Sequence, residues 1–276
     1  MAAAALREAS PGIKVDTALH VTFSSTMEVG LYVRWRRALD GDDARTTGAS
    51  APEEAVLDRW WQEIVQGYTN PVRRYHGLTH LQQMFGEMDR HAGRLARPDL
   101  VALAIFFHDL IYDPGSSTNE EDSAERFHLF AQEATRLPMK DIKKVHTYIL
   151  ATKTHKPAPP PIEDDKDEDL LLFLDIDMSI LGQPRQVYMM YAGAIRSEYK
   201  HVPRLTYLTK RAEVLSSMLG EGGGGRWIYA SDFYRQELEE QARDNLLGEI
   251  QMLREGVIPY EEQKGEKEGE GGKGEI

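Results

Sequence analysis

Two adjacent residues with metal-binding chemistry, His108 and Asp109, stand at the end of an apolar run. Apart from this pair, every position from Leu100 to Ile111 is apolar, which suits a helix enclosed on most sides by other helices. Carboxylates are almost never fully buried unless they are paired or bind a metal. The pair therefore indicates a metal site, with helix capping or an ion pair as the structural alternatives.

Two further apolar segments bring ligand-type side chains near one end. His80 lies beside the apolar stripe of a helix that Asn70-Pro71 is expected to begin, and Asp175 and Asp177 follow the run 170–174. Two imidazoles and two carboxylates suit Mn, Fe, Mg, Co or Ni, and also Zn. Each residue alone fits an ordinary structural role, so the combination carries the prediction.

The hydrophobic spacing along the chain predicts an all-α fold, without strand alternation or internal repeats. We expect helices at about 27–39, 52–65, 70–88, 98–111, 119–134, 138–151, 184–200, 202–219 and 230–254.

The expected organisation is one helical domain with irregular ends. Residues 1–26 form a loose leader, 27–258 form the domain, and the low-complexity tail 259–276 is predicted to be disordered. Within the domain, the Pro-rich and acidic segment 156–169 is predicted to be a solvated loop. The Gly-rich segment 220–225 lacks the Gly-Lys-Ser/Thr ending of a P-loop and is also a loop.

Composition excludes several classes of function. The chain has no cysteine among 276 residues, so it has neither disulfides nor thiolate metal ligands. The total charge of −12 includes −5 in residues 163–169 and −3 in residues 261–276, which leaves −4 elsewhere. Nothing indicates a basic surface for nucleic acid.

Hydropathy gives no sign of a membrane protein. No apolar run reaches the roughly 20 residues of a membrane helix. The first thirty residues contain no apolar signal core, so we expect no secretory signal and a cytoplasmic location, with an organelle address left open.

In their order along the chain, His80, His108-Asp109 and Asp177 resemble the His, His-Asp, Asp signature of the HD superfamily of metal-dependent phosphohydrolases, which are all-α helical bundles. The resemblance is closer to a subgroup of predicted HD phosphohydrolases and spans roughly residues 55 to 250. The pattern of this subgroup is echoed by Arg73-x-Tyr75-His76-x-x-x-His80, Phe107-His108-Asp109-x-x-Tyr112-Asp113, Asn119-Glu120-x-x-Ser123-Ala124, Ala151-Thr152-Lys153-x-His155, Asp175-Ile176-Asp177-x-x-Ile180-Leu181-Gly182 and Ile195-Arg196-x-Glu198-Tyr199.

The resemblance implies that His80, His108, Asp109 and Asp177 are the metal ligands. Asp177 is preferred to Asp175 because the ligand acid of HD domains precedes the pattern that ends here in Ile-Leu-Gly. Asp175 is left with two roles, orienting a ligand histidine or pairing with an arginine.

The resemblance also implies the number of ions. Binuclear relatives place a third histidine where this chain has Asn119-Glu120, so one divalent ion per chain is expected.

Other residues receive roles in phosphoester hydrolysis. His76, one helical turn before His80, could protonate the leaving oxygen, as the comparable histidine of relatives in this superfamily does, or form a hydrogen bond that fixes the helix start. Asp113 could position the attacking water. His155 is a candidate for contacting the substrate or a second, weaker ion. Cationic candidates for holding phosphate are Arg73, Lys153, Arg196 and Arg211, with Arg196 preferred.

The predicted function is divalent-metal-dependent hydrolysis of a phosphoester in a small phosphorylated metabolite, with nucleotides included. The alternatives are an HD-type diiron oxygenase, which Asn119 disfavours, and a non-catalytic HD-fold protein that binds a ligand or partner.

Overall fold

The described part of the chain is helical, as the hydrophobic spacing of the sequence predicts. The computed structural model describes residues 25–43, 53–155, 166–220 and 227–260, and these residues form ten α-helices, two 3₁₀ helices and no strand. The predicted all-α fold is confirmed. The elements are α2 (Thr26–Asp43), α3 (Glu54–Tyr68), α4 (Leu78–Arg90), η1 (Ala92–Arg94), α5 (Pro98–Phe107), α6 (Asn119–Ala134), α7 (Met139–Ala151), α8 (Glu168–Met178), η2 (Ser179–Gly182), α9 (Arg185–Glu198), α10 (Arg204–Met218) and α11 (Asp232–Arg254).

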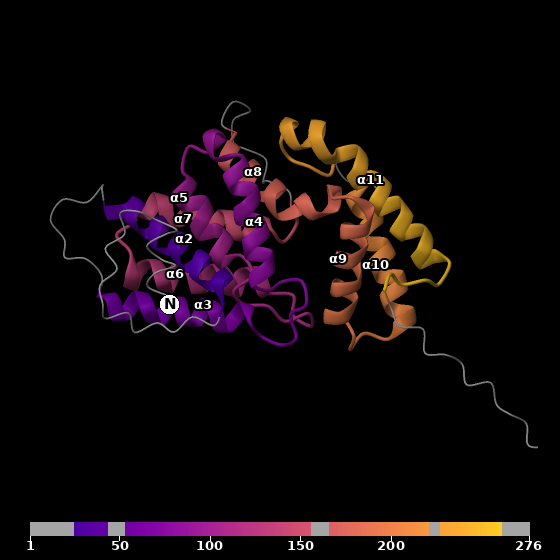
Figure 1. Cartoon of the computed structure of the whole chain (residues 1–276), viewed down its shortest axis with the longest axis horizontal. Coiled ribbons are helices and arrows are strands. Elements are labelled where there is room, and N and C mark those ends of the chain that lie inside the picture. The colour runs from indigo at the N-terminus through magenta and orange to yellow at the C-terminus, as the bar shows by residue number, and fades with distance from the viewer. Residues whose placement is uncertain (1–24, 44–52, 156–165, 221–226, 261–276) are drawn as a thin grey trace, which may run out of the picture.

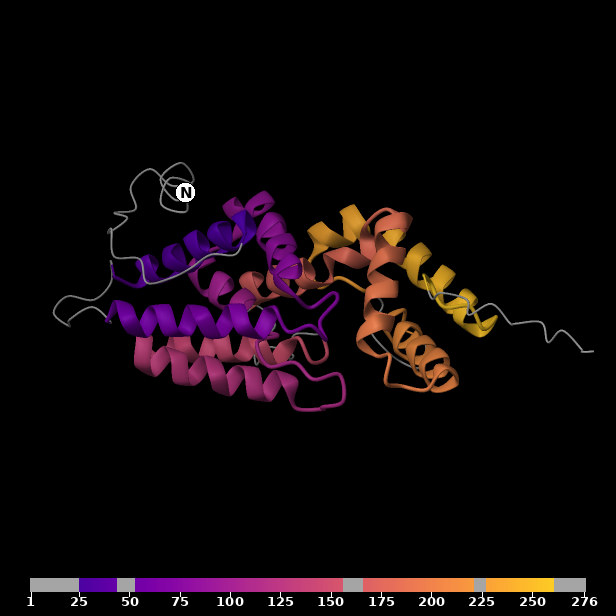
Figure 2. The same ribbon diagram turned by 60° about the horizontal axis from the view of Figure 1, so that its bottom comes forward.

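The helices form two groups that follow each other along the long axis (Figures 1 and 2). Helices α2 to α8 pack together in the first group. The chain then passes through η2 into the second group, where α10 and α11 lie side by side and α11 also packs on η2 and α9. Side chains from both groups meet where the segment before α4 approaches α9.

Helix α5 is the centre of the first group. It contacts α2, α4, α6, α7 and α8, and every residue from Leu100 to Phe107 is buried. Trp35 of α2 packs against this helix with its ring 5.5 Å from Phe106 and 5.0 Å from Phe130 of α6, measured between centroids. The apolar run therefore forms the core of this group. Because the helix is held on all sides, the backbone position of His108, the next residue, is fixed.

Two helix boundaries differ from the predictions. Helix α5 ends at Phe107 and not near Ile111, so His108 is its C-cap residue. Asn70-Pro71 does not begin a helix, and α4 starts eight residues after Asn70, at Leu78. The Asn70 side chain instead accepts a hydrogen bond from the Val72 N–H, which is the Asx turn that competes with helix capping.

Smaller differences occur at two other elements. Helix α2 continues to Asp43, four residues beyond the predicted end. Helix α8 begins at Glu168, two residues inside the predicted acidic loop, because the Asp167 carboxylate accepts a hydrogen bond from the Leu170 N–H and caps the helix.

Several predictions lie outside the described residues. These are most of the leader 1–26, the larger part of the loop 156–169, all but the first residue of the Gly-rich loop 220–225, and the tail from residue 261.

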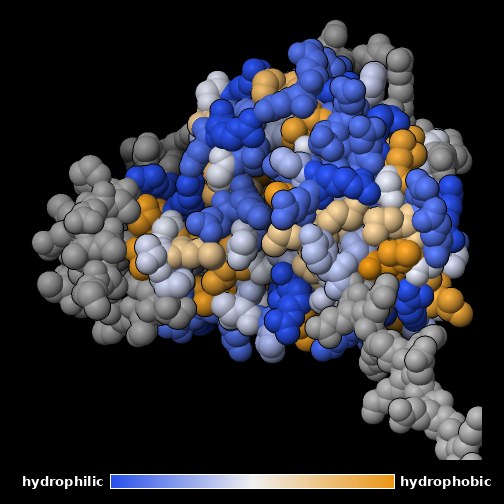
Figure 3. Space-filling model, turned by 45° about the vertical axis from the view of Figure 1, so that its right-hand side comes forward, coloured by the Kyte–Doolittle hydropathy of each residue, from blue (hydrophilic) through white to orange (hydrophobic). Residues whose placement is uncertain are grey.

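The described surface gives no sign of a membrane span. None of the described helices combines the length and apolar character needed to cross a bilayer. Figure 3 shows a face on which hydrophilic residues predominate and hydrophobic residues form small separate groups.

Replacing Trp35 with Ala should lower the free energy of unfolding by about 3 to 5 kcal/mol, because the fully buried ring would leave a cavity against α5. Urea unfolding followed by circular dichroism measures the change. The control is Leu205→Ala, at a side chain that is 76% exposed, where we expect a change below about 0.5 kcal/mol. Equal effects at the two sites would contradict this account of the core.

Candidate metal centre

Three helices bring the four predicted metal ligands to one place. His80 lies in the first turn of α4, His108 and Asp109 follow α5, and Asp177 is near the end of α8. The Nε2 atoms of His80 and His108 are 3.3 Å apart, and His108 Nε2 is 3.2 Å from Asp109 Oδ2. Asp177 Oδ1 lies 3.2 Å from His80 Nε2 and 3.8 Å from His108 Nε2.

The spacing of these atoms fits a single metal ion. Nitrogen and oxygen ligands that lie about 2.1 Å from one ion are separated from each other by about 3.0 to 3.5 Å. One ligand atom each from His80, His108 and Asp109 lies within 4.8 Å of the others, so this group could hold a metal ion. Asp177 is outside that group of three but approaches both imidazoles.

A backbone hydrogen bond orients His108. Its Nδ1 lies 2.9 Å from the carbonyl oxygen of Ile105, one turn earlier in α5. A carbonyl oxygen can only accept, so Nδ1 carries the proton and Nε2 faces the cluster. Metal-binding histidines are commonly oriented by such a bond on the second ring nitrogen.

His80 is buried and has an unsatisfied nitrogen. Its residue is 2% exposed, and Nδ1 has no hydrogen-bond partner in the structure. Its Nε2 atom points to His108 and Asp177. The unsatisfied Nδ1 does not identify a ligand, so the case for His80 rests on its Nε2 atom, which lies among the other predicted ligand atoms.

The charges of the cluster depend on one another. Burial alone would raise the pKa of the Asp177 carboxyl, but hydrogen bonds from His155 and His80 hold it well below its usual range. Burial also opposes the charge of His108, yet Asp109 and Asp177 raise its pKa to about 9. Burial lowers the pKa of His80. The carboxylates are thus ionised, and a cation would replace the proton on His108, since an imidazole must be neutral at the nitrogen that binds metal.

His76 lies beside the ligands and is held by α9. Its Nδ1 is 2.7 Å from Oε2 of Glu198, the last residue of α9, and its Nε2 is 4.0 Å from Asp109 Oδ2. His76 is not on a helix with His80, as the sequence suggested, but lies in the turn before α4. The two rings still lie 5.8 Å apart, measured between centroids.

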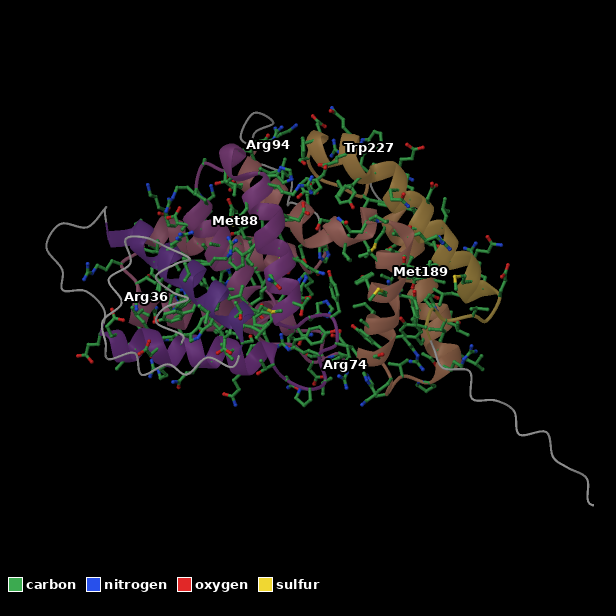
Figure 4. All side chains as sticks on the ribbon, in the orientation of Figure 1. Arg36, Arg74, Met88, Arg94, Met189 and Trp227 are labelled. Carbon is green, nitrogen blue, oxygen red and sulfur yellow. The ribbon has the colours of Figure 1, made fainter. Side chains whose placement is uncertain are left out.

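The Glu198 carboxylate also fixes the backbone around His76. Oε1 accepts hydrogen bonds from the N–H groups of Arg74, Tyr75 and His76 at 2.6, 2.7 and 3.0 Å, and Oε2 accepts one from the Tyr112 hydroxyl at 2.7 Å. Figure 4 shows Arg74 in the segment next to the lower end of α9. Burial would raise the pKa of Glu198, but hydrogen bonding to His76 and to the other donors lowers it to about 2.

A cavity of about 250 Å³ opens onto the cluster, and we call it the metal-side cavity. Its wall includes Asp109 and Asp177 together with His76 and His155. His155 Nε2 lies 3.0 Å from Asp177 Oδ2, so the predicted substrate residue is near the ligands.

Four other predicted site residues are directed elsewhere. The exposed Asp113 carboxylate accepts a hydrogen bond from the Gly115 N–H in a turn, and it does not line the metal-side cavity. The predicted role of Asp113 in positioning water is therefore not supported by its position. The remaining three, Arg73, Lys153 and Arg196, are cations predicted to hold phosphate, and neither they nor the fourth such cation, Arg211, line this cavity.

Each of these cations is occupied by other groups. Arg73 donates to the backbone carbonyls of His76, Asp109 and Leu110, which holds the loop behind the cluster. Lys153 contacts Glu121 and the carbonyl of Ser117. Arg196 donates to the carbonyls of Tyr199 and Val202. Arg73 and Arg196 thus have structural contacts in place of the expected phosphate-binding role.

Asp175 takes neither of its two predicted roles. Its carboxylate accepts hydrogen bonds from the N–H groups of Ala230 and Ser231 at 2.6 and 2.7 Å, just before α11. It therefore connects α8 to the start of α11, and Asp177 is the acid at the cluster. Burial raises the pKa of Asp175 to about 6, against the effect of these hydrogen bonds.

Asn119 also has a structural contact. Its side-chain oxygen accepts from the Asp113 N–H and its side-chain nitrogen donates to the Asp113 carbonyl.

The sequence did not single out Glu198 as a site residue, although a signal was present. Tyr188, Ala192, Ile195 and Glu198 recur at helical spacing along the buried face of α9. A carboxylate in line with an apolar stripe must be paired or hydrogen-bonded. That rule pointed to His108-Asp109 and applies to Glu198 equally.

Comparison with known proteins finds no match for this chain among family models, curated proteins or solved structures.

Replacing Asp109 with Ala should abolish tight binding of metal, because it removes the carboxylate next to both His108 and His76. After incubation with Mn²⁺ and gel filtration, elemental analysis should find about one ion per wild-type chain and almost none in the variant. Far-ultraviolet circular dichroism should show most of the helix content retained. Asp113→Ala is the matched control and should keep its metal, whereas full retention by Asp109→Ala would refute the assignment.

Replacing Glu198 with Gln should cost about 3 kcal/mol of unfolding free energy at pH 7, because the pKa of this carboxyl falls from 4.5 to about 2 on folding. A lowered pKa stabilises the fold above pH 4.5, and this stabilisation is lost as the pH falls toward 2. The deficit of the variant should therefore shrink below pH 4.5 in urea unfolding. Glu240→Gln, at an exposed site on α11, is the control, and a deficit independent of pH would contradict the prediction.

Proposed function

We propose that this chain is a member of the HD superfamily and a divalent-metal-dependent phosphohydrolase that hydrolyses a phosphoester of a small metabolite. The observation that carries the proposal is the position of His76, a histidine fixed by a buried carboxylate, beside a cluster of two histidines and two aspartates. A metal site alone could serve storage or structure. A positioned histidine next to the ligands supports acid–base chemistry at the same place.

The residues that would hold the ion are His80, His108, Asp109 and Asp177. When bound there, a divalent ion lowers the pKa of water and neutralises phosphate oxygens as their charge develops. The donor set does not distinguish among Mn, Fe, Mg, Co, Ni and Zn.

His76 is the proposed general acid. The ionised Glu198 carboxylate accepts a hydrogen bond from the Nδ1–H of His76, so Nε2 is the nitrogen that faces Asp109 and the metal-side cavity. Burial lowers the pKa of His76, but Asp109 and Glu198 outweigh this effect and raise it. A raised pKa favours a proton on His76, which it would give to the leaving oxygen when the bond to phosphorus breaks.

The charge of the cavity wall supports a substrate with a single phosphate. Among the described residues, the wall of the metal-side cavity contains no lysine or arginine, and its positive charge can come only from histidines and from a bound ion. Polyphosphate groups usually require several fixed cations. A phosphomonoester matches the available charge better.

The test is a screen of phosphorylated metabolites for release of inorganic phosphate, with Mn²⁺, Mg²⁺, Co²⁺ or Fe²⁺ added. We expect one or more phosphomonoesters to be hydrolysed by the wild type and none by Asp109→Ala. His76→Gln should retain metal and lower kcat by about 10² to 10⁴, since the general acid is lost.

Three outcomes would contradict the proposal. Two irons per chain together with oxygen consumption would favour a diiron oxygenase. Neither metal nor turnover would favour a ligand-binding protein with the HD fold. Unchanged kcat in His76→Gln would remove the role of this histidine.

A further inference from the structure

A second cavity, of about 500 Å³, adjoins the metal-side cavity. His76, Tyr191 and Tyr199 line both cavities, so His76 stands between them. We call the second cavity the tyrosine chamber, after Tyr191, Tyr199 and Tyr207 in its wall. Its volume is within the range of small-molecule binding sites.

The tyrosine chamber lies between α9 and α10. On α10, the residues at 206, 207, 210, 211 and 214 line it, and this spacing describes one face of a helix. Tyr191 from the middle of α9, Ile195 from its last turn and Tyr199 just after it complete this part of the wall. The chamber is therefore a property of how these two helices face each other, and not of the metal ligands.

Aromatic rings and a buried hydroxyl characterise the chamber. The rings of Tyr199 and Tyr207 lie 6.5 Å apart between centroids. Tyr207 is 5% exposed, and its hydroxyl has no hydrogen-bond partner in the structure. Burial raises the pKa of Tyr207 to about 12, so the hydroxyl keeps its proton and remains a donor. This hydroxyl is shielded from solvent, so a ligand in the chamber reaches it only when the Tyr207 side chain turns, and a polar ligand atom would then satisfy it.

The cations in the wall are already paired. Arg211 Nε lies 2.9 Å from Glu249 Oε1, and the Arg211 guanidinium carbon is 5.5 Å from the centre of the Tyr191 ring. Lys210 Nζ lies 2.8 Å from Glu213 Oε2. His76, which also lines the chamber, is paired with Glu198. With these charges paired, the chamber favours an uncharged group over a second phosphate. Phenol rings favour a planar ring over a flexible chain, because stacked aromatic groups gain energy beyond their buried area.

We propose that the tyrosine chamber binds the organic part of the substrate, an uncharged heteroaromatic ring with a hydrogen-bonding edge, while the phosphate occupies the metal-side cavity. This proposal rests on the proposed function. The ester oxygen then lies at His76, where the two cavities meet. On hydrolysis, water oxygen bonds to phosphorus as the bond from phosphorus to the ester oxygen breaks, and the proton of His76 goes to that oxygen, which leaves as the alcohol. One proton of the water stays on the phosphate, and the other passes to solvent, from which His76 takes up a proton again.

The test measures binding of rings that carry no phosphate, so it does not depend on turnover. Adenosine, uridine and pyridoxine are titrated into the full chain by calorimetry, with glycerol and 1-hexanol as non-aromatic controls. We expect at least one ring compound to bind with a Kd below about 1 mM and at least tenfold more tightly than either control.

Substitutions on α10 test whether the ring compounds bind in the tyrosine chamber. Thr206→Trp places a large side chain in the chamber from an exposed position and should weaken ring binding at least tenfold. Leu205→Trp is the matched control, since this neighbour on α10 is exposed, does not line the chamber and should leave binding unchanged. Tyr207→Phe removes only the unpaired hydroxyl and should weaken binding about fivefold.

The outcomes separate this inference from the proposed function. The proposed role of the chamber would be overturned if no ring compound binds, if 1-hexanol binds as tightly as the ring compounds, or if Thr206→Trp binds them with the affinity of the wild type. Phosphate release at equal kcat/KM from glycerol phosphate and from aromatic phosphomonoesters would also overturn it, while leaving the hydrolase in place. Ring binding that Thr206→Trp weakens, without phosphate release from any ester, would support the chamber and overturn the proposed hydrolase.

Discussion

The buried carboxylate of Glu198 joins the two groups of helices at the candidate site. It ends α9 in the second group and accepts hydrogen bonds from three successive backbone N–H groups of the segment before α4. The same carboxylate fixes the Nδ1 proton of His76 and binds the Tyr112 hydroxyl. Without it, the backbone of this segment would lack hydrogen-bond partners, and His76 would have no fixed direction. One ionised carboxylate thus connects the two groups of helices and orients His76, the proposed acid.

The second constraint is the abrupt end of α5. A helix buried on all sides delivers His108 into the interior, where an imidazole and a carboxylate are costly unless they are paired or bind a cation. Arg73 holds the chain that follows by donating to the carbonyls of Asp109 and Leu110. The cluster is therefore rigid on the side of the core and open on the side of the metal-side cavity, which is the arrangement that a ligand site requires.

Much of the site followed from residue types and their order. The rule that buried carboxylates need partners identified His108-Asp109, and the structure brings His80 and Asp177 to the same place. The rule does not give the direction of an exposed or long side chain, and two predicted site residues lie away from the metal-side cavity. Asp113 and Arg73 have the right chemistry and lie near the motif in sequence, but a local turn and backbone carbonyls satisfy them.

The sequence by itself determined that the chain is helical, where its apolar faces lie and which side chains have metal-binding chemistry, because these depend on local spacing and residue type. Only the tertiary structure decided that Glu198 contacts His76, that Asp175 connects to α11 and that a tyrosine-lined chamber adjoins the cluster. The first two features are hydrogen bonds across 122 and 55 residues of chain, and the chamber depends on how α10 packs beside α9 and on His76 from the first group. Such contacts are set by how whole helices pack, and no local pattern encodes them.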